Sequence, residues 1–243
     1  MKKLVSVMML TLALGAFAFS QAGAGGGGGR GGQRGGGGAA MYARVGVQYG
    51  LISHADVQTA LKVTDDQKTK LTAAADARTA AMTAARDAGG DQATQGAART
   101  KAGQDYNTAV QGVLTADQKV ELLNIFVVIA KNQALVNSEV QVALSLGADE
   151  QTKIKELVTA EGKAGASLRQ QVTDGTMDQA AANAARTKNA ETLSNDLLAA
   201  LTDAHKTAFA KMASDANFTP DPAVRNYLGG GGGRRGGGGG GGN

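Results

Sequence analysis

Few side chains in this sequence could carry out acid–base, nucleophilic or metal chemistry. The 243 residues include two histidines, His54 and His205, and no cysteine. A helical zinc site uses two histidines four residues apart, and these two are widely separated. Without a thiol there is no thiolate chemistry and no disulfide. No nucleophile, base and orienting group can be assembled, so we predict no catalytic residue, no metal site, no cofactor and no enzymatic activity.

The two histidines fit helix starts better than a reaction centre. His54 precedes a predicted short helix, and His205 is the third residue after a threonine that can cap another helix. Both positions favour a surface or capping role. The alternative is weak sensing of metal or protons, because a lone histidine titrates near neutral pH. Asp65 and Asp66 are interpreted as partners of a helix dipole rather than as an acid–base pair.

The polar residues that recur at fixed spacing are helix caps. In a capping box, a hydroxyl accepts from the backbone N–H three residues on, and the side chain there accepts from the N–H of the cap. Glycine is also a permitted cap. Four pairs have this spacing: Thr64 with Gln67, Thr115 with Gln118, Gly147 with Glu150, and Thr202 with His205. We predict that these eight residues mark four helix starts.

The four caps belong to a segment that occurs twice. The string from Ala97 to Lys101 returns unchanged at 184–188, an offset of 87 (184 minus 97), whereas Val57 matches Val140 with an offset of 83 (140 minus 57). Four residues make about one helical turn, so we place the insertion inside the first long helix of the second copy. The chain is therefore expected to be all-α, with two tandem helical-hairpin repeats.

The repeats are predicted at 41–136 and 137–219. In the first, a helix from Thr64 to about Gly89 is followed by a return helix over 92–113. In the second, helices over 149–172 and 177–201 form the same hairpin. Short helices capped by Ser53 and Ser138 are expected to precede the two hairpins. Pro220 and Pro222 are expected to end the ordered structure.

The N-terminus has the features of a secretory signal peptide. Lys2 and Lys3 precede an apolar stretch that ends at Phe19, and small residues follow up to Ala24. That stretch is shorter than the roughly 20 residues that span a bilayer, and an uncleaved anchor is the alternative. We predict a signal peptide over 1–24 and a periplasmic or secreted protein.

Glycine dominates the predicted linker over 25–40 and the predicted tail over 220–243. Such segments bury little and lose much backbone entropy on ordering, so we expect them to be disordered. Every Asp and Glu lies between Asp56 and Asp221, so the net charge of +4 arises outside the helical part. Without aromatic residues to stack on bases, no nucleic-acid partner is expected. Weak adhesion to anionic envelope polymers remains an interpretation of the tail arginines Arg30, Arg34, Arg234 and Arg235.

The most apolar stretch after the signal runs from Leu122 to Ala130. A helix that is apolar most of the way round must be covered on more than one face, which favours a buried core helix. The Ala-rich hairpins offer limited material to cover it. A partner-facing surface on Leu122, Ile125 and Ile129 is therefore the alternative.

The helix starts at Leu114-Thr115-Ala116-Asp117-Gln118 and Val63-Thr64-Asp65-Asp66-Gln67 resemble the motif of the LTXXQ-motif (Spy/CpxP-like) family of periplasmic proteins. The starts at Leu146 and Leu201 are degenerate versions. The resemblance implies a curved, all-helical, ATP-independent chaperone or envelope-stress adaptor that binds unfolded or stress-related partners. Members of the family pair, so two fused units would form an intrachain pseudo-dimer.

One departure from the family is the charge of the helical part, which is close to neutral where Spy-like cradles are strongly basic. Binding of clients by charge attraction is therefore in doubt. A function of a different class is the alternative: a structural or adhesive envelope protein whose helices act as a spacer and whose Gly/Arg tails make the contacts.

Overall fold

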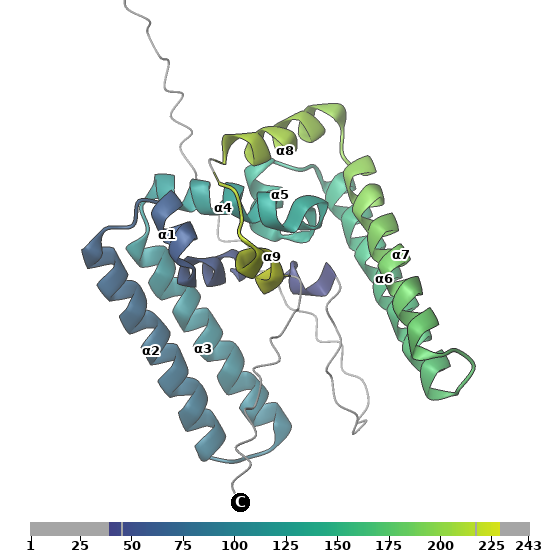
Figure 1. Cartoon of the computed structure of the whole chain (residues 1–243), viewed down its shortest axis with the longest axis horizontal. Coiled ribbons are helices and arrows are strands. Elements are labelled where there is room, and N and C mark those ends of the chain that lie inside the picture. The colour runs from purple at the N-terminus through teal and green to yellow at the C-terminus, as the bar shows by residue number, and fades with distance from the viewer. Residues whose placement is uncertain (1–38, 45, 217, 229–243) are drawn as a thin grey trace, which may run out of the picture. The chain divides into compact units, whose positions relative to one another are not determined.

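The computed structural model describes residues 39–44, 46–216 and 218–228. All regular secondary structure in these ranges is helical, as Figure 1 shows, so the all-α prediction is confirmed. None of the helices described is both long enough and apolar enough to cross a membrane. The predicted signal peptide, the linker up to residue 38 and the tail from residue 229 lie outside the described residues.

The same order of helices occurs in both halves of the described chain. The first half contains the 3-10 helix η2 (Val47–Ser53), α1 (Ala55–Ala60), α2 (Asp65–Asp87), α3 (Gln92–Val113) and α4 (Ala116–Ala130). The second half contains η3 (Lys131–Val136), α5 (Ser138–Ala143), α6 (Ala148–Thr173), α7 (Gln179–Ala199) and α8 (Asp203–Asp215). A 3-10 turn η1 (Ala39–Met41) precedes them, and α9 (Pro222–Leu228) follows.

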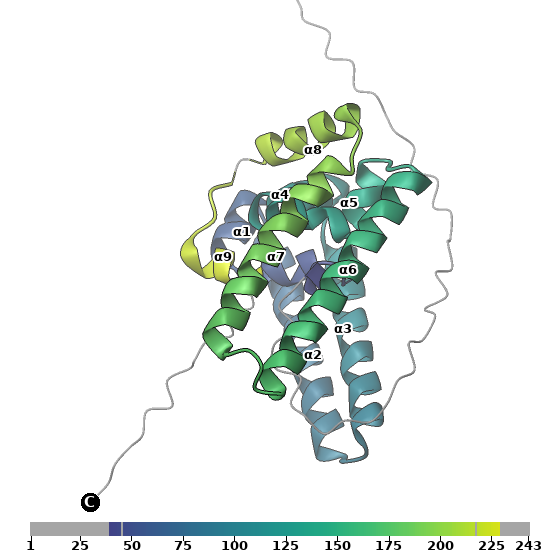
Figure 2. The same ribbon diagram turned by 90° about the vertical axis from the view of Figure 1, so that its right-hand side faces the viewer.

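Two helical hairpins are the longest elements. Helices α2 and α3 lie side by side, and so do α6 and α7 (Figure 2). Gly89, Gly90 and Gly175 adopt positive φ angles of 68°, 100° and 71° at the hairpin turns, where glycine is free of strain. Alanine makes up much of both hairpins and buries little area per residue. The hairpins therefore depend on the core at their base.

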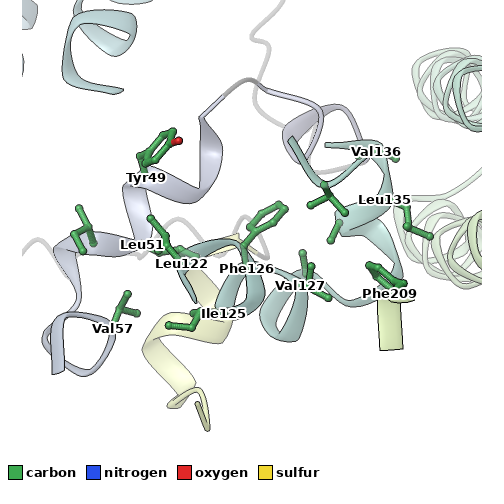
Figure 3. Packing of buried hydrophobic residues seen from close by; sticks show 14 of the residues in the cluster. Tyr49, Leu51, Val57, Leu122, Ile125, Phe126, Val127, Leu135, Val136 and Phe209 are labelled. Atoms are coloured by element: carbon green, nitrogen blue, oxygen red, sulfur yellow. The ribbon is translucent and has the colours of Figure 1, made fainter. Parts of the chain in front are cut away.

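That core is built around α4. Leu122, Ile125 and Phe126 have no exposed surface. Figure 3 shows these side chains on different sides of α4, with Leu51 of η2 near Leu122 and Phe209 of α8 on the side of Val127. Helix α9 also contacts α4. Helices from both ends of the described chain thus cover α4. This burial on more than one face is what a helix that is apolar most of the way round requires.

Each hairpin is entered through a tight turn after a short helix. Lys62 and Ser145 adopt left-handed backbone angles, with φ of 51° and 54°. The N–H of Val63 bonds the carbonyl of Gln58, and the N–H of Leu146 bonds that of Gln141, each at 3.0 Å. A bond that spans five residues across a left-handed residue is the Schellman ending of a helix.

The structure corrects the predicted caps of the two short helices. The N-cap of α1 is His54 rather than Ser53, whose hydroxyl instead bonds the carbonyl of Gly50. The N-cap of α5 is Asn137 rather than Ser138, and its side chain accepts from the N–H groups of Glu139 and Val140. Asparagine is among the strongest caps, so the residue one position earlier takes this role.

The predicted ends of the helical region also differ from the structure. Pro222 begins α9 instead of ending the ordered chain, because proline fits the first turn of a helix, where its missing N–H costs nothing. The Asp221 carboxylate accepts from the N–H of Val224 at 2.8 Å and caps this turn. Ala39, predicted as part of the linker, is buried in η1.

Candidate functional site

The first capping junction joins the starts of α2 and α4 through two glutamines. Gln67 and Gln118 each accept from the N–H of their own cap, Thr64 and Thr115, at 3.1 and 3.0 Å. Both threonine hydroxyls accept in return, which completes two capping boxes. The two side-chain amides also bond each other, with N···O distances of 2.7 and 3.0 Å. The caps therefore lock two helices that start 51 residues apart.

The remaining side-chain amide hydrogens of Gln67 and Gln118 donate to backbone carbonyls just before the starts of the two helices. Gln67 donates to the carbonyl of Val113 at 2.9 Å, and Gln118 donates to that of Leu61 at 3.0 Å. Every amide group of the pair is satisfied by uncharged partners. The junction contains no group that titrates near neutral pH.

The second capping junction joins the starts of α6 and α8 with an acid and a base. The Glu150 carboxylate accepts from the N–H of Gly147 at 3.1 Å and from that of Thr202 at 2.8 Å, so one side chain serves both caps. His205 Nδ1 lies 2.9 and 2.8 Å from its two oxygens. A carboxylate only accepts, so Nδ1 carries the proton in this pair. Gly147 has no side chain to complete its own box.

The surroundings of Glu150 favour its ionised form. Burial is the largest single influence and raises the pKa, but hydrogen bonds from His205 and from the N–H groups of Thr202 and Gly147, together with the charge of His205, outweigh it. The pKa of the Glu150 carboxyl falls from 4.5 to about 2. The junction is thus held by a carboxylate anion that persists well below neutral pH.

His54 has a different role from His205. It occupies the N-cap position of α1 without a side-chain capping bond. Its ring packs edge-on against Tyr227 of α9 at 5.2 Å between centroids. The Nε2 atom is buried and bonds to nothing within the described ranges. No cluster of three His, Asp or Glu side chains that could hold a metal ion occurs among the residues that the structure describes.

The candidate partner-facing residues on α4 are mostly interior. Leu122 and Ile125 have no exposed surface, which agrees with the favoured interpretation of a core helix and rules out the alternative of a partner-facing surface for these two residues. Their face is covered by the helices from both ends of the chain. Ile129 is half-buried against the core. The apolar surface that stays open lies further along, where α4 ends.

There, the ends of α4 and α7 and one face of α8 enclose a groove of about 690 Å³, which we call the α8 groove. Its apolar lining comes from Val127 and Val128 of α4, Leu198 of α7, and Phe209, Ala210 and Ala213 of α8. Lys131, Asn132 and Lys206 supply the polar lining. The volume falls within the range of ligand sites, and the groove is open to solvent.

The second capping junction fixes one wall of this groove. His205 adjoins Lys206 at the start of α8, and Phe209 lies about one turn further along the helix. On the opposite side, the Asn132 amide donates to the carbonyl of Ser194 on α7 at 3.0 Å. Polar contacts at its edges thus hold both sides of the groove, while most of its lining is apolar.

Another hollow, of about 330 Å³, lies beside α6 and is lined by Lys153, Glu156, Leu157, Ala160 and Ala200. It is about half the volume of the α8 groove. An acidic and a basic residue both line it, so it has no preferred ligand charge. The α8 groove is therefore the stronger candidate for a binding site.

Sequence reasoning found the four helix starts but not the contacts between them, and the Thr202 N–H bonds Glu150 rather than the predicted partner His205. Residues three positions after each cap could have shown the pairing: two glutamines can bond each other, and a glutamate can pair with a histidine. The α8 groove has no signal in the sequence, because it depends on how three helices meet. Comparison with protein-family models, with curated proteins and with solved structures finds no match to this chain.

Proposed function

We propose that this protein is an exported, Spy/CpxP-like helical protein that holds unfolded or stress-related envelope proteins without ATP and without catalysis. The α8 groove carries the proposal. It is open to solvent, and its lining includes the partly exposed Val128, Leu198 and Ala213 above the buried Val127 and Phe209, which suits a segment of a partner chain. The sequence also lacks a set of residues that could perform a reaction.

The tandem duplication belongs to the same proposal. Gln58 and Gln141, which are 83 residues apart, each donate a side-chain bond of 2.8 Å to the carbonyl six residues earlier, on Ile52 and Leu135. Lys62 and Ser145, at the same offset, share the left-handed turn. Helices α4 and α8, which follow the two hairpins, contact each other. These correspondences support two related units that pair within one chain, with glycine- and arginine-rich tails at either end.

The alternative is a structural or adhesive envelope protein in which the tail arginines make the contacts. An aggregation assay separates the two functions when the full chain is compared with a form that lacks both tails. A holding chaperone should suppress aggregation of a chemically unfolded client at near-stoichiometric amounts in both forms. An adhesive protein should show no suppression and should lose attachment to anionic polymers when the tails are removed. Absence of suppression by both forms would refute the chaperone proposal.

A further inference from the structure

The α8 groove carries positive charge at its edge and no acidic residue in its lining. Lys206 bonds Asp203 at 3.0 Å, but the Asp203 side chain is almost fully exposed, so this pair is weak. Lys131 makes no ion pair with any part of the chain that the structure describes. Lys131, an exposed residue of the groove lining, therefore carries a positive charge with no ion-pair partner in the described chain.

The backbone of Lys131 is also strained. Its φ of 52° and ψ of −142° form a combination that glycine adopts freely and that a residue with a Cβ adopts at a cost. Lys131 is the C-cap of α4, and its N–H bonds the carbonyl of Val127. Lysine at position 131 therefore destabilises the folded state relative to glycine. No ion pair within the described chain offsets this loss of stability.

We propose that the α8 groove binds an extended apolar peptide segment that carries a carboxylate, with the ammonium of Lys131 as the partner of that carboxylate. This inference rests on the proposed holding function and names the kind of segment that is held. The apolar walls provide for Leu- or Phe-like side chains, and the unpaired lysine complements a neighbouring Glu or Asp. The groove is open to solvent, so a segment of a partner chain can reach it from outside.

The test measures fluorescence anisotropy of a labelled peptide of Leu, Phe and Glu titrated with the full chain. A matched peptide with Lys in place of Glu is the comparison. We expect the Glu peptide to bind more tightly, and Lys131→Gly and Lys131→Gln each to weaken it about three- to fivefold, the size expected for one partly exposed charge pair. The preference for Glu should shrink in high salt.

Lys62→Gly is the matched control, because it relieves a positive φ of nearly the same size at a turn whose residue does not line the groove. It should leave peptide affinity unchanged. Equal binding of both peptides, or equal losses in the Lys62 and Lys131 variants, would overturn the inference. So would binding of oleate without binding of the Glu peptide, since the carboxylate would then come from a lipid.

Suppression of client aggregation, measured on the same proteins, separates the two proposals. If the full chain suppresses aggregation and the Lys131 variants do so equally well with no peptide preference, the holding function stands and the groove assignment fails. If the full chain neither suppresses aggregation nor binds either peptide, the proposed function fails, and this inference fails with it.

Discussion

The two capping junctions hold their helices in the same way but with different chemistry. In the first, two neutral glutamines each serve their own cap and then bond each other. In the second, a single buried carboxylate serves both caps and takes a histidine as its partner. A glutamine donates and accepts, so a pair of them can satisfy itself. A carboxylate only accepts, so it needs donors from elsewhere.

Because of this difference, we expect the two junctions to respond differently to acid and to substitution. The first junction has no charge to lose. The second concentrates three hydrogen-bond donors on one ionised group, and charge-assisted hydrogen bonds are stronger than neutral ones. The second junction also starts the helix that forms one wall of the α8 groove. Changes at Glu150 are expected to reach the groove more directly than changes at Gln67, because the α4 residues in the lining lie at the end of that helix away from the first junction.

The largest expected effect comes from truncating the two acceptors. Glu150→Ala leaves the N–H groups of Gly147 and Thr202 and the His205 ring without their common acceptor, and should lower the free energy of unfolding by about 2–3 kcal/mol. Gln67→Ala removes uncharged bonds and should cost about 1–2 kcal/mol. Urea unfolding followed by circular dichroism measures both. Equal losses of unfolding free energy in the two variants would contradict the proposed difference between the junctions.

A double substitution of intermediate effect, Glu150→Gln with His205→Gln, turns the second junction into a copy of the first. The folded-state pKa of Glu150 is lowered from 4.5 to about 2, so its ionised form contributes stability above about pH 4.5, and that stability is lost as pH falls towards 2. We expect the double variant to be less stable than the parent at neutral pH, and the gap to close with acid.

The measurement is the urea midpoint of both proteins from neutral pH down to about pH 3, where the parent should lose the larger share of its stability. Asp149→Asn is the control, since it removes a carboxylate from the same first turn that makes no contact with His205. It should keep the acid response of the parent. A gap that stays constant with pH would show that Glu150 is not the group responsible.

The smallest effect concerns the missing cap hydroxyl. Gly147 has ordinary angles, φ −69° and ψ 162°, and an added Cβ would meet Glu150 Oε2 at 3.8 Å, a normal contact distance. Gly147→Ser should therefore complete the capping box and raise stability by about 0.3 kcal/mol. Thr64→Gly is the reverse substitution at the equivalent cap of the first half, and it should lower stability by about the same amount. Thermal unfolding of both variants reports the difference, and a loss in Gly147→Ser would contradict it.

The helix starts were predictable because capping is local. It depends only on the threonine at the cap and on the residue three positions later. The bond between Gln67 and Gln118 was not, because it needs two helices to begin side by side. Likewise, the apolar run of α4 identified a core helix without telling which of its faces stays open, since that depends on helices from both ends of the chain.

Two other features were hidden for different reasons. Proline marks the end of one helix and the first turn of another equally well, so Pro222 gave no warning of α9. The positive φ of Lys131 was also invisible, since lysine is not a residue that signals such a conformation. The groove was hidden for a further reason, because it is defined by how three helices pack together.

Helix α9 has a consequence for the order in which the molecule assembles. Val224 has no exposed surface, and the Tyr227 hydroxyl lies where a side chain at Gly50 would begin, so the last described turn closes over the first elements of the core. A nascent chain that lacks residues 222–228 therefore leaves the side of α4 that α9 contacts without its cover. Residues 222–228 are thus needed to complete the cover of the central helix, so α4 stays partly uncovered until they have been synthesised.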